Sequence, residues 1–168
     1  MPSSDQGIDE KRYRVIPRTL IFITCDDRVL LIKGNPDKRI WANRYNGIGG
    51  HIENGENVLS AARRELVEET GLQGVPLRLA GTVMVDIGGL LGICIFVFQG
   101  TSATQNVRPS EEGSLEWVEV SKINTLPLVE DLPILIPKVF AGDGEIFFAN
   151  SHYDEEDKLV LDFSVSGG

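Results

Sequence analysis

The sequence predicts an α/β domain in which a mixed β-sheet lies between helices. Two observations favour this class. Short runs of β-branched and other apolar residues flank one amphipathic helical segment, and the elements follow the order β-rich, helix, β-rich, helix, β. A length of 168 residues with 42% hydrophobic residues suits one core that folds alone. We therefore expect a single domain over residues 12–163, with flexible polar segments at 1–11 and 164–168.

The first predicted strands form a hairpin. Apolar runs at Thr19–Thr24 and Val29–Lys33 are separated by Asp26 and Asp27, a pair typical of a tight turn. Four glycines then fall within the nine residues 47–55. Glycine allows backbone conformations that other residues resist, so we expect this glycine loop to contact a ligand.

The glycine loop leads into the first helix. Asn57 is a favourable N-cap residue and Gly71 lies where a left-handed glycine ends a helix, which predicts a helix over Val58–Thr70. The later predicted elements are two strands around a Gly88-Gly89 turn (Leu77–Asp86 and Leu90–Gln99), a strand (Leu115–Val120), a short helix (Leu132–Phe140) and a closing hairpin (Glu145–Ala149 with Lys158–Phe163).

Charge and composition narrow the class of partner. The 16 basic and 25 acidic residues give a net charge of −9, so the surface should repel nucleic-acid polymers and anionic lipid. Cys25 and Cys94 lie in apolar runs without zinc-site spacing and are expected to be free thiols. With no run long enough to span a membrane, we expect a cytoplasmic protein, although these observations leave secretion open. A phosphorylated ligand would need local basic residues or a metal.

The predicted first helix has an apolar face and an acidic face. Three apolar residues share helical spacing (Leu59, Ala62 and Leu66), and three glutamates fall at i, i+3 and i+4 (Glu65, Glu68 and Glu69). Like charges at this spacing cost roughly a few tenths of a kcal/mol per pair, and the C-terminal end of the helix dipole also disfavours acids. A hard cation such as Mg²⁺ or Mn²⁺ would compensate this repulsion. The alternative is a solvated acidic face.

The spacing around the acidic face favours a metal site. From Gly50 onward the sequence reads G-x5-E-x7-R-E-L-x-E-E-x-G-L, with these defined positions filled by Gly50, Glu56, Arg64, Glu65, Leu66, Glu68, Glu69, Gly71 and Leu72. This segment matches the Nudix box at every defined position, so the chain resembles the Nudix hydrolases. The resemblance implies a Nudix α/β/α sandwich that hydrolyses a diphosphate linkage in a nucleotide-like substrate.

The resemblance also implies roles for individual residues. The metal ligands for Mg²⁺, or for Mn²⁺ as a substitute, would be Glu65, Glu68, Glu69 and the Gly50 carbonyl. Arg64 would pair with Glu56 and fix the loop against the helix. Glu65 would also orient or deprotonate the attacking water, so Glu65, Arg64 and Glu56 form the predicted catalytic group.

Substrate choice depends on residues outside the box. Ile87, Gly88 and Gly89 stand where some branches have a proline (ADP-ribose or coenzyme A) or a tyrosine (dinucleoside polyphosphates), which favours a mononucleotide. Four segments resemble, in order and spacing, the branch that hydrolyses oxidised purine nucleoside triphosphates: RYNGIGGHIENGE, SEEGSLEWVEV, LPLVEDLP and the closing FF…LVLDF hairpin.

The same branch implies a pocket for the base. Asn46 would hydrogen-bond the base, and Glu130 and Asp131 would face its Watson–Crick edge. Two neighbouring carboxyl groups can share a proton, so that one donates and one accepts, which suits an 8-oxo-purine. The alternatives are an N-capping acid pair before the second helix and, for Asn46, a turn residue before Gly47.

The chain departs from this branch at the base stack. Leu128 stands where the branch places an aromatic residue ahead of its acid pair. Tyr45 or Trp41 would then supply an aromatic surface, although a structural role also fits each, and we expect Trp117 in the core. His51 has no nucleophile to pair with, so we assign it no catalytic role.

Three further residues complete the predicted site. Glu112 matches an extra carboxylate that the branch adds to its metal site, with Glu111 and Glu116 as alternatives. Lys33 and Arg44 flank the glycine loop and are candidates for phosphate contacts, although solvated surface also explains each.

The resemblance thus implies a Mg²⁺-dependent pyrophosphohydrolase. It would convert a nucleoside triphosphate, with an 8-oxo-purine in a housecleaning role, to the monophosphate and pyrophosphate. The alternatives are another nucleoside diphosphate-X substrate, such as a nucleotide sugar or ADP-ribose, and a nucleotide-sensing module without turnover. The expected partner is a nucleotide and neither a nucleic-acid polymer nor a membrane, while monomer and homodimer both remain open.

Overall fold

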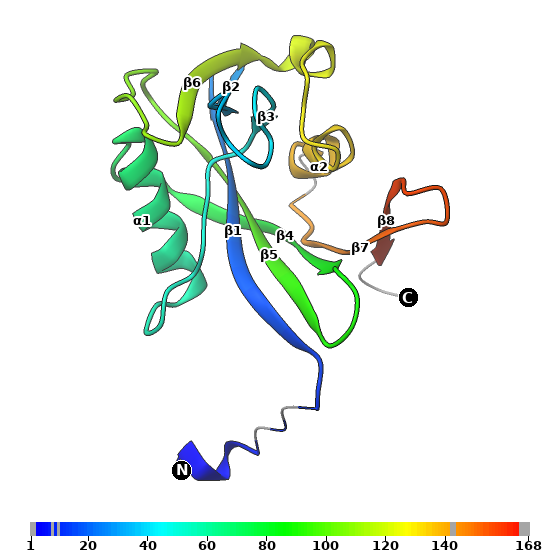
Figure 1. Ribbon diagram of the computed structural model, residues 1–168. Coiled ribbons are helices and arrows are strands. Elements are labelled where there is room, and N and C mark those ends of the chain that lie inside the picture. Colours follow the sequence, from blue (N-terminus) through cyan, green and yellow to red (C-terminus); the bar gives the residue numbers. More distant parts are fainter. Residues whose placement is uncertain (1–2, 8, 10, 142–143, 165–168) are drawn as a thin grey trace.

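A mixed β-sheet with helices on its two sides forms the body of the protein in the computed structural model (Figure 1). The structure describes all residues except 1–2, 8, 10, 142–143 and 165–168. The elements are η1 (Ser3–Gln6), β1 (Arg14–Cys25), β2 (Arg28–Gly34), β3 (Tyr45–Asn46), α1 (Val58–Thr70), β4 (Leu77–Asp86), β5 (Leu91–Thr101), β6 (Gly113–Glu119), η2 (Val120–Thr125), α2 (Leu132–Val139), β7 (Phe147–Tyr153) and β8 (Leu159–Ser164). No helix within the described ranges is long and apolar enough to cross a membrane.

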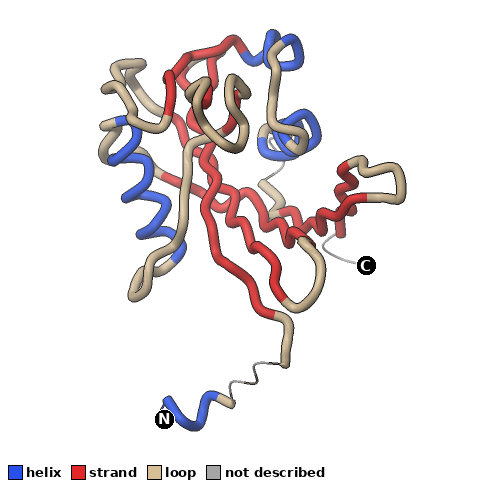
Figure 2. The backbone as a smooth tube through the Cα atoms, viewed as in Figure 1, coloured by secondary structure: helices blue, strands red, loops and turns tan. Residues whose placement is uncertain are grey.

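The sheet is mixed because two of its strand pairs are parallel. The strand order is β3-β2-β1-β5-β4-β7-β8, and β6 also pairs with β2. β1 runs parallel to β5, and β4 runs parallel to β7, whereas the other neighbours are antiparallel. Figure 2 shows the strands as one continuous red layer, with the closing hairpin β7–β8 at its far end.

The glycine loop lies along β1. β1 pairs with β2 only beside their turn, over residues 23–25. Earlier along β1, Ile21 N donates to Ile48 O at 2.6 Å and Thr19 N donates to Gly50 O at 2.8 Å. These bonds attach the glycine loop to β1. The loop is followed in the sequence by α1.

Alternate residues of the central strands face opposite helices. The core on the α2 side contains one set together with the buried face of α2: Leu20, Phe22, Val29, Leu31, Leu132 and Leu135. The core on the α1 side contains the intervening set together with the buried face of α1: Ile21, Ile23, Leu30, Ile32, Ala62 and Leu66. This period-two alternation gives the sheet two buried faces. The predicted α/β/α sandwich is therefore confirmed.

The predicted first helix is confirmed with its caps. Asn57 Oδ1 accepts hydrogen bonds from the backbone N–H groups of Leu59 (3.1 Å) and Ser60 (2.9 Å). Gly71 has φ 76°, and its N–H donates to Val67 O at 2.9 Å. These two bonding patterns end the helix at both sides, as the sequence indicates.

The other predicted elements are present with shifted ends. The turn at Asp26 (φ 54°) and the turn at Gly88 (φ 88°) join hairpins as expected, and β7 starts two residues later than predicted. The sequence interpretation missed β3 and η2, because a two-residue strand and a short 3-10 helix have too few residues for a periodic pattern.

The two predicted flexible ends fall only in part within the described residues. Residues 3–6 form η1, and residue 164 belongs to β8, so it was wrongly placed in the tail. Residues 1–2, 8, 10 and 165–168 lie outside the described residues. The flexibility of the remaining end residues stays a prediction.

Candidate active site

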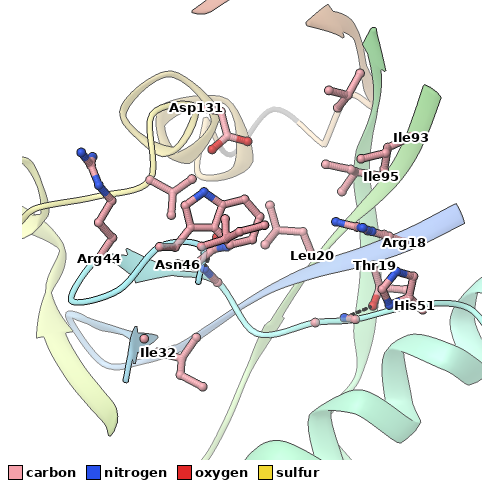
Figure 3. A pocket seen from close by; sticks show the side chains of 18 of the residues that line it. Arg18, Thr19, Leu20, Ile32, Arg44, Asn46, His51, Ile93, Ile95 and Asp131 are labelled. Carbon is pink, nitrogen blue, oxygen red and sulfur yellow. Dashed lines mark hydrogen bonds between the residues drawn. The ribbon is translucent and has the colours of Figure 1, made fainter. Parts of the chain in front are cut away.

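A cavity of about 820 Å³ opens where the glycine loop, β1 and the start of α2 meet. Its lining includes most of the predicted site residues: Gly50, Glu65, Glu69, Glu112, Arg44, Asn46, Glu130 and Asp131. Figure 3 shows the labelled part of this lining, with Asp131 on one wall and Arg18, Thr19 and His51 on another. Glu56, Arg64, Glu68 and Lys33 do not line the cavity.

Arg64 joins the glycine loop to α1. Its Nε donates to Glu56 Oε1 at 2.7 Å and its Nη2 to Glu56 Oε2 at 3.0 Å, so the predicted pair is present and bidentate. Arg64 Nη2 also donates to His51 O at 3.0 Å, and Nη1 donates to Glu65 Oε1 at 2.8 Å. Arg64 lowers the pKa of the Glu56 carboxyl, and Glu56 in turn raises the pKa of the guanidinium. The pair is therefore ionised and holds the loop against the helix.

Two glycines allow the loop to approach its neighbours closely. A Cβ on Gly50 would lie 2.5 Å from Glu65 Oε1, and a Cβ on Gly49, whose φ is 152°, would lie 2.2 Å from Thr19 O. Either contact is too short for a real side chain. The glycine at position 50 therefore lets the Glu65 carboxylate pack directly on the loop backbone, and the glycine at position 49 lets the loop lie against β1.

Glu69 is a buried carboxyl group without enough partners. Its Oε2 is buried and makes no hydrogen bond. Burial raises the pKa of Glu69 to about 8, with further contributions from the negative charges of Glu65 and Glu112. A buried carboxyl oxygen without a partner is costly. A cation bound between these carboxylates would satisfy it, so the residues present fit a divalent metal.

Glu68 does not take the position that the sequence interpretation predicted. It lies outside the cavity lining, and its side chain is 57% exposed and accepts a hydrogen bond from Arg64 Nη1 at 3.0 Å. Across the described residues, no group of three Asp, Glu, His or Cys side chains stands ready to hold a metal ion. Glu68 is thus paired with Arg64 and not with the cavity carboxylates.

The cavity separates the three candidates for the extra carboxylate. Glu112 lines the cavity and forms an ion pair with Lys38. Glu116 accepts a hydrogen bond from the Tyr45 hydroxyl at 2.8 Å, and neither it nor Glu111 lines the cavity. Only Glu112 of the three thus faces the same space as Glu69.

The predicted base pocket lies beside the start of α2. Asp131 Oδ1 is buried without a hydrogen-bond partner, and burial, followed by the Glu130 charge, raises the pKa of Asp131. Asp131 is at the N-cap position of α2, but its side chain makes no capping hydrogen bond. The structure therefore gives no support to the capping alternative for Asp131. Asn46 Oδ1 accepts from Gly47 N at 2.8 Å, so Asn46 does have the turn role that was the alternative for it.

The aromatic residues differ in their access to the cavity. Leu128 and Tyr45 are buried and outside its lining, whereas Trp41 lines it and is 47% exposed. Trp117 packs against the α1-side core, and its Nε1 donates to Gln105 O at 2.9 Å, as expected for a structural residue. Of the aromatic residues that the sequence singled out, Trp41 is therefore the one placed to meet a ligand.

The two residues predicted to contact phosphate differ in position. Lys33 lies with its Nζ 5.5 Å from the centre of the Tyr45 ring and does not line the cavity, so its contact with phosphate stays a prediction. A strand residue next to the glycine loop can point away from it, and the sequence did not reveal this direction. Arg44 lines the cavity and donates through Nη1 to Leu128 O at 3.0 Å.

Sequence reasoning missed several cavity residues. Arg18, Lys38 and Tyr153 line the cavity and come from β1, the loop after β2 and β7. Arg18 carries a weak sequence signal, because it is a charged residue at the start of an apolar run. Lys38 and Tyr153 carry none, since their positions depend on how distant segments fold together.

Comparisons with known proteins agree with this geometry. The NUDIX domain family model matches residues 15–139. An oxidized purine nucleoside triphosphate hydrolase of Mus musculus is 32% identical over 127 residues, covering 71% of this chain and 79% of the relative. The protein of the same description from Danio rerio is 32% identical over 106 residues, covering 62% of this chain and 67% of the relative. An uncharacterized Nudix hydrolase of Bacillus subtilis is 34% identical over 131 residues, covering 75% of this chain and 80% of the relative.

Solved structures share the fold. A MutT protein from Bacillus halodurans superposes with a TM-score of 0.73 at 24% identity, covering 89% of this chain and 98% of that one. The NUDIX domain of NrtR from Shewanella oneidensis, solved with ADP ribose, gives a TM-score of 0.69 at 16% identity, covering 84% of this chain and 99% of that one. Because the family match spans most of the chain, and Gly50, Glu65 and Glu69 of the box line the cavity, this chain belongs to the Nudix hydrolases, enzymes that act on phosphoanhydride bonds.

Proposed function

We propose that the chain is a Mg²⁺-dependent pyrophosphohydrolase of nucleoside triphosphates whose preferred base is an 8-oxo-purine. Water would attack the phosphate chain, and the products would be the nucleoside monophosphate and pyrophosphate. The observation that carries the proposal is the buried Glu69 carboxyl group with its unpartnered Oε2, which shares one cavity with Asn46 and Asp131. One end of the cavity thus has the carboxylate of Glu69, and the other end, at Asn46 and Asp131, is proposed to hold the base.

At the carboxylate end, the proposed metal ligands are Glu65, Glu69, Glu112 and the Gly50 carbonyl. A bound divalent ion supplies positive charge to the phosphate oxygens and makes a bound water more acidic. Glu65 then orients or deprotonates the attacking water, because its carboxylate packs against the loop backbone at Gly50. Glu68 would join this set only by leaving Arg64, which its exposed position allows.

The Arg64–Glu56 pair positions the glycine loop. Its bidentate contact, together with the bond from Arg64 to His51 O, fixes the loop that carries Gly50. Arg64 also donates to Glu65, so one guanidinium sets the relation between the loop and the carboxylate that is proposed to handle the water. We therefore treat Arg64 and Glu56 as positioning residues.

At the base end, Asp131 and Glu130 differ in environment. Burial raises the pKa of Asp131, which favours its neutral form, while Glu130 is exposed. A neutral Asp131 donates a hydrogen bond and a carboxyl oxygen of Glu130 accepts one, which is the pair of functions that the edge of an 8-oxo-purine requires. Trp41 supplies the aromatic face that Leu128 lacks, and Asn46 and Arg44 complete the nucleotide contacts.

The names of two relatives support the same substrate class. The Danio rerio and Mus musculus proteins are described as oxidized purine nucleoside triphosphate hydrolases, and both are 32% identical to this chain. The NrtR structure contains ADP ribose, but an identity of 16% extends to the fold alone. The relatives therefore favour a triphosphate over ADP-ribose.

A hydrolysis screen tests the proposal. Normal and 8-oxo nucleoside triphosphates, dinucleoside polyphosphates, ADP-ribose and nucleotide sugars are incubated with the protein in Mg²⁺, in Mn²⁺ and in EDTA, and the products are separated by ion exchange. We expect 8-oxo-purine triphosphates to give the highest kcat/KM, the monophosphate and pyrophosphate as products, and no turnover in EDTA.

Each other result of the screen has a defined meaning. Equal cleavage of normal and 8-oxo triphosphates would remove the housecleaning role but keep the hydrolase. Preference for ADP-ribose or a nucleotide sugar would establish the alternative substrate class. Binding without turnover in either metal would indicate a nucleotide-sensing module instead.

A further inference from the structure

Arg18 is a cavity-lining cation without a partner. It belongs to β1, where its Cα is the partner of Ile95 on β5, and a bridge links it to His51 on the other side. Its Nε is buried without a hydrogen bond, and no ion pair involves Arg18 within the described part of the chain. A buried donor without a partner costs free energy. A ligand group that accepts a hydrogen bond from Arg18 would remove this cost, and the ligand would bind more tightly.

The other basic side chains of the cavity are already engaged. Lys38 forms an ion pair with Glu112, and Arg44 donates to the carbonyl of Leu128 at 3.0 Å. Arg18 differs from both, because none of its guanidinium nitrogens has a hydrogen bond or an ion pair within the described part of the chain. Figure 3 shows Arg18 and Arg44 entering from opposite sides of the cavity.

The surroundings of Arg18 suit a base better than a phosphate chain. Its labelled neighbours in Figure 3 include Leu20, Ile93 and Ile95, which give this part of the cavity an apolar wall. Apolar walls suit the flat faces of a base, and they strengthen a charge-assisted hydrogen bond by excluding water. The phosphate chain of the proposed substrate has a different destination, the carboxylates Glu65 and Glu69 with their metal.

We infer that Arg18 donates to a carbonyl oxygen of the bound base and so makes the cavity prefer oxo-purines to adenine. The guanidinium can donate N–H groups to the O6 carbonyl oxygen, which guanine, hypoxanthine and 8-oxoguanine share, whereas adenine has an amino group in place of O6. This inference rests on the proposed function, because it assigns the base that the triphosphate carries.

Equilibrium binding without turnover tests the inference. Dissociation constants for dGMP, dIMP and dAMP are measured in EDTA by isothermal titration calorimetry, for the wild type and for Arg18→Met. The wild type should bind dGMP and dIMP more tightly than dAMP. Arg18→Met should weaken dGMP and dIMP binding by about tenfold or more while changing dAMP binding by less than about twofold. Arg18→Lys keeps the positive charge but lacks the planar set of N–H groups. It should retain only part of the preference for dGMP and dIMP over dAMP.

Arg63→Met is the matched control, because Arg63 is exposed on α1 and does not line the cavity. It should leave all three constants unchanged, and thermal unfolding confirms that each variant is folded. Equal weakening of dGMP, dIMP and dAMP by Arg18→Met would place the contact on the phosphate and overturn the inference. No effect of either Arg18 variant would overturn it as well. Failure of triphosphate hydrolysis with an intact preference for keto bases would instead defeat the proposed function alone.

Discussion

Arg64 holds Glu56 through two hydrogen bonds, from Nε to Oε1 at 2.7 Å and from Nη2 to Oε2 at 3.0 Å. The two residues are eight positions apart, one before α1 and one within it. Nη1 of the same guanidinium reaches Glu65 at 2.8 Å. One planar group therefore ties the loop, the helix and the carboxylate proposed to act on water, and only arginine has enough N–H groups in a fixed plane for this.

Arg64→Lys tests whether this contact depends on the planar guanidinium or only on its positive charge. Lysine keeps a positive charge but cannot bond both Glu56 oxygens and Glu65 together. We expect kcat/KM for the preferred triphosphate to fall by about tenfold or more and the melting temperature to fall by about a few degrees. Steady-state kinetics and thermal unfolding measure these effects. Arg63→Lys is the control, and an Arg64→Lys enzyme with unchanged kcat/KM would contradict the positioning role.

Glu69 should make stability depend on pH. Because burial raises its pKa to about 8, the metal-free folded protein keeps a proton that the unfolded chain has lost above its ordinary pKa of about 4.3. The unfolded state thus binds fewer protons between these values, so the free energy of unfolding should decrease as pH rises through this window. Glu69→Gln lacks this titrating group.

Urea unfolding in EDTA at a series of pH values from about 5 to about 9 tests this dependence. The wild type should lose more stability across the series than Glu69→Gln does. Asp131, whose pKa is also raised, is present in both proteins and cancels in the comparison. Parallel curves for the two proteins would show that the Glu69 carboxyl group titrates normally.

Mg²⁺ should stabilise the wild type through the same carboxylates. A ligand that binds only the folded state raises the melting temperature as its concentration increases. We expect a Mg²⁺-dependent rise for the wild type, a rise abolished in Glu69→Gln, and a rise largely retained in Glu68→Gln, because Glu68 lies outside the cavity. Both variants should fold, and Glu69→Gln should lose most turnover. Glu111→Gln is the control, and near-normal kcat in Glu69→Gln would contradict the metal site.

The sequence predicted the local features of this fold well. The helix from Val58 to Thr70 has both its ends marked by residues whose capping chemistry acts within one turn. The Arg64–Glu56 pair was also predictable, because a fixed spacing in a known motif implied it. The positions of Lys33 and Glu68 were not, since each depends on a competing partner, the Tyr45 ring and Arg64.

The rest of the cavity was hidden for a topological reason. Arg18 of β1 and Tyr153 of β7 both line the cavity, although they are 135 positions apart in the sequence. Sheet order brings them to one cavity, and no local pattern records that order. Residues supplied by a motif could therefore be predicted, whereas residues supplied by β1 and β7, which β5 and β4 separate in the sheet, required the structure.

Trp41 should report nucleotide binding through its fluorescence. The chain has two tryptophans, and Trp41 lines the cavity while Trp117 packs against the α1-side core. Stacking on a base is worth about 1–3 kcal/mol by alanine substitution in other proteins, so Trp41→Ala should weaken monophosphate binding by about tenfold or more. Trp41 also has φ 61°, a conformation that is strained for a bulky side chain and is often found at functional sites.

Two single-tryptophan proteins complete this test. In Trp117→Phe the remaining indole is Trp41, and titration with dGMP should quench its emission to saturation. In Trp41→Phe the remaining indole is Trp117, whose Nε1 is bonded to Gln105 O, and its emission should not respond. A response from Trp117 alone, or unchanged affinity in Trp41→Ala, would mean that the base stacks on an apolar wall such as that formed by Ile93 and Ile95.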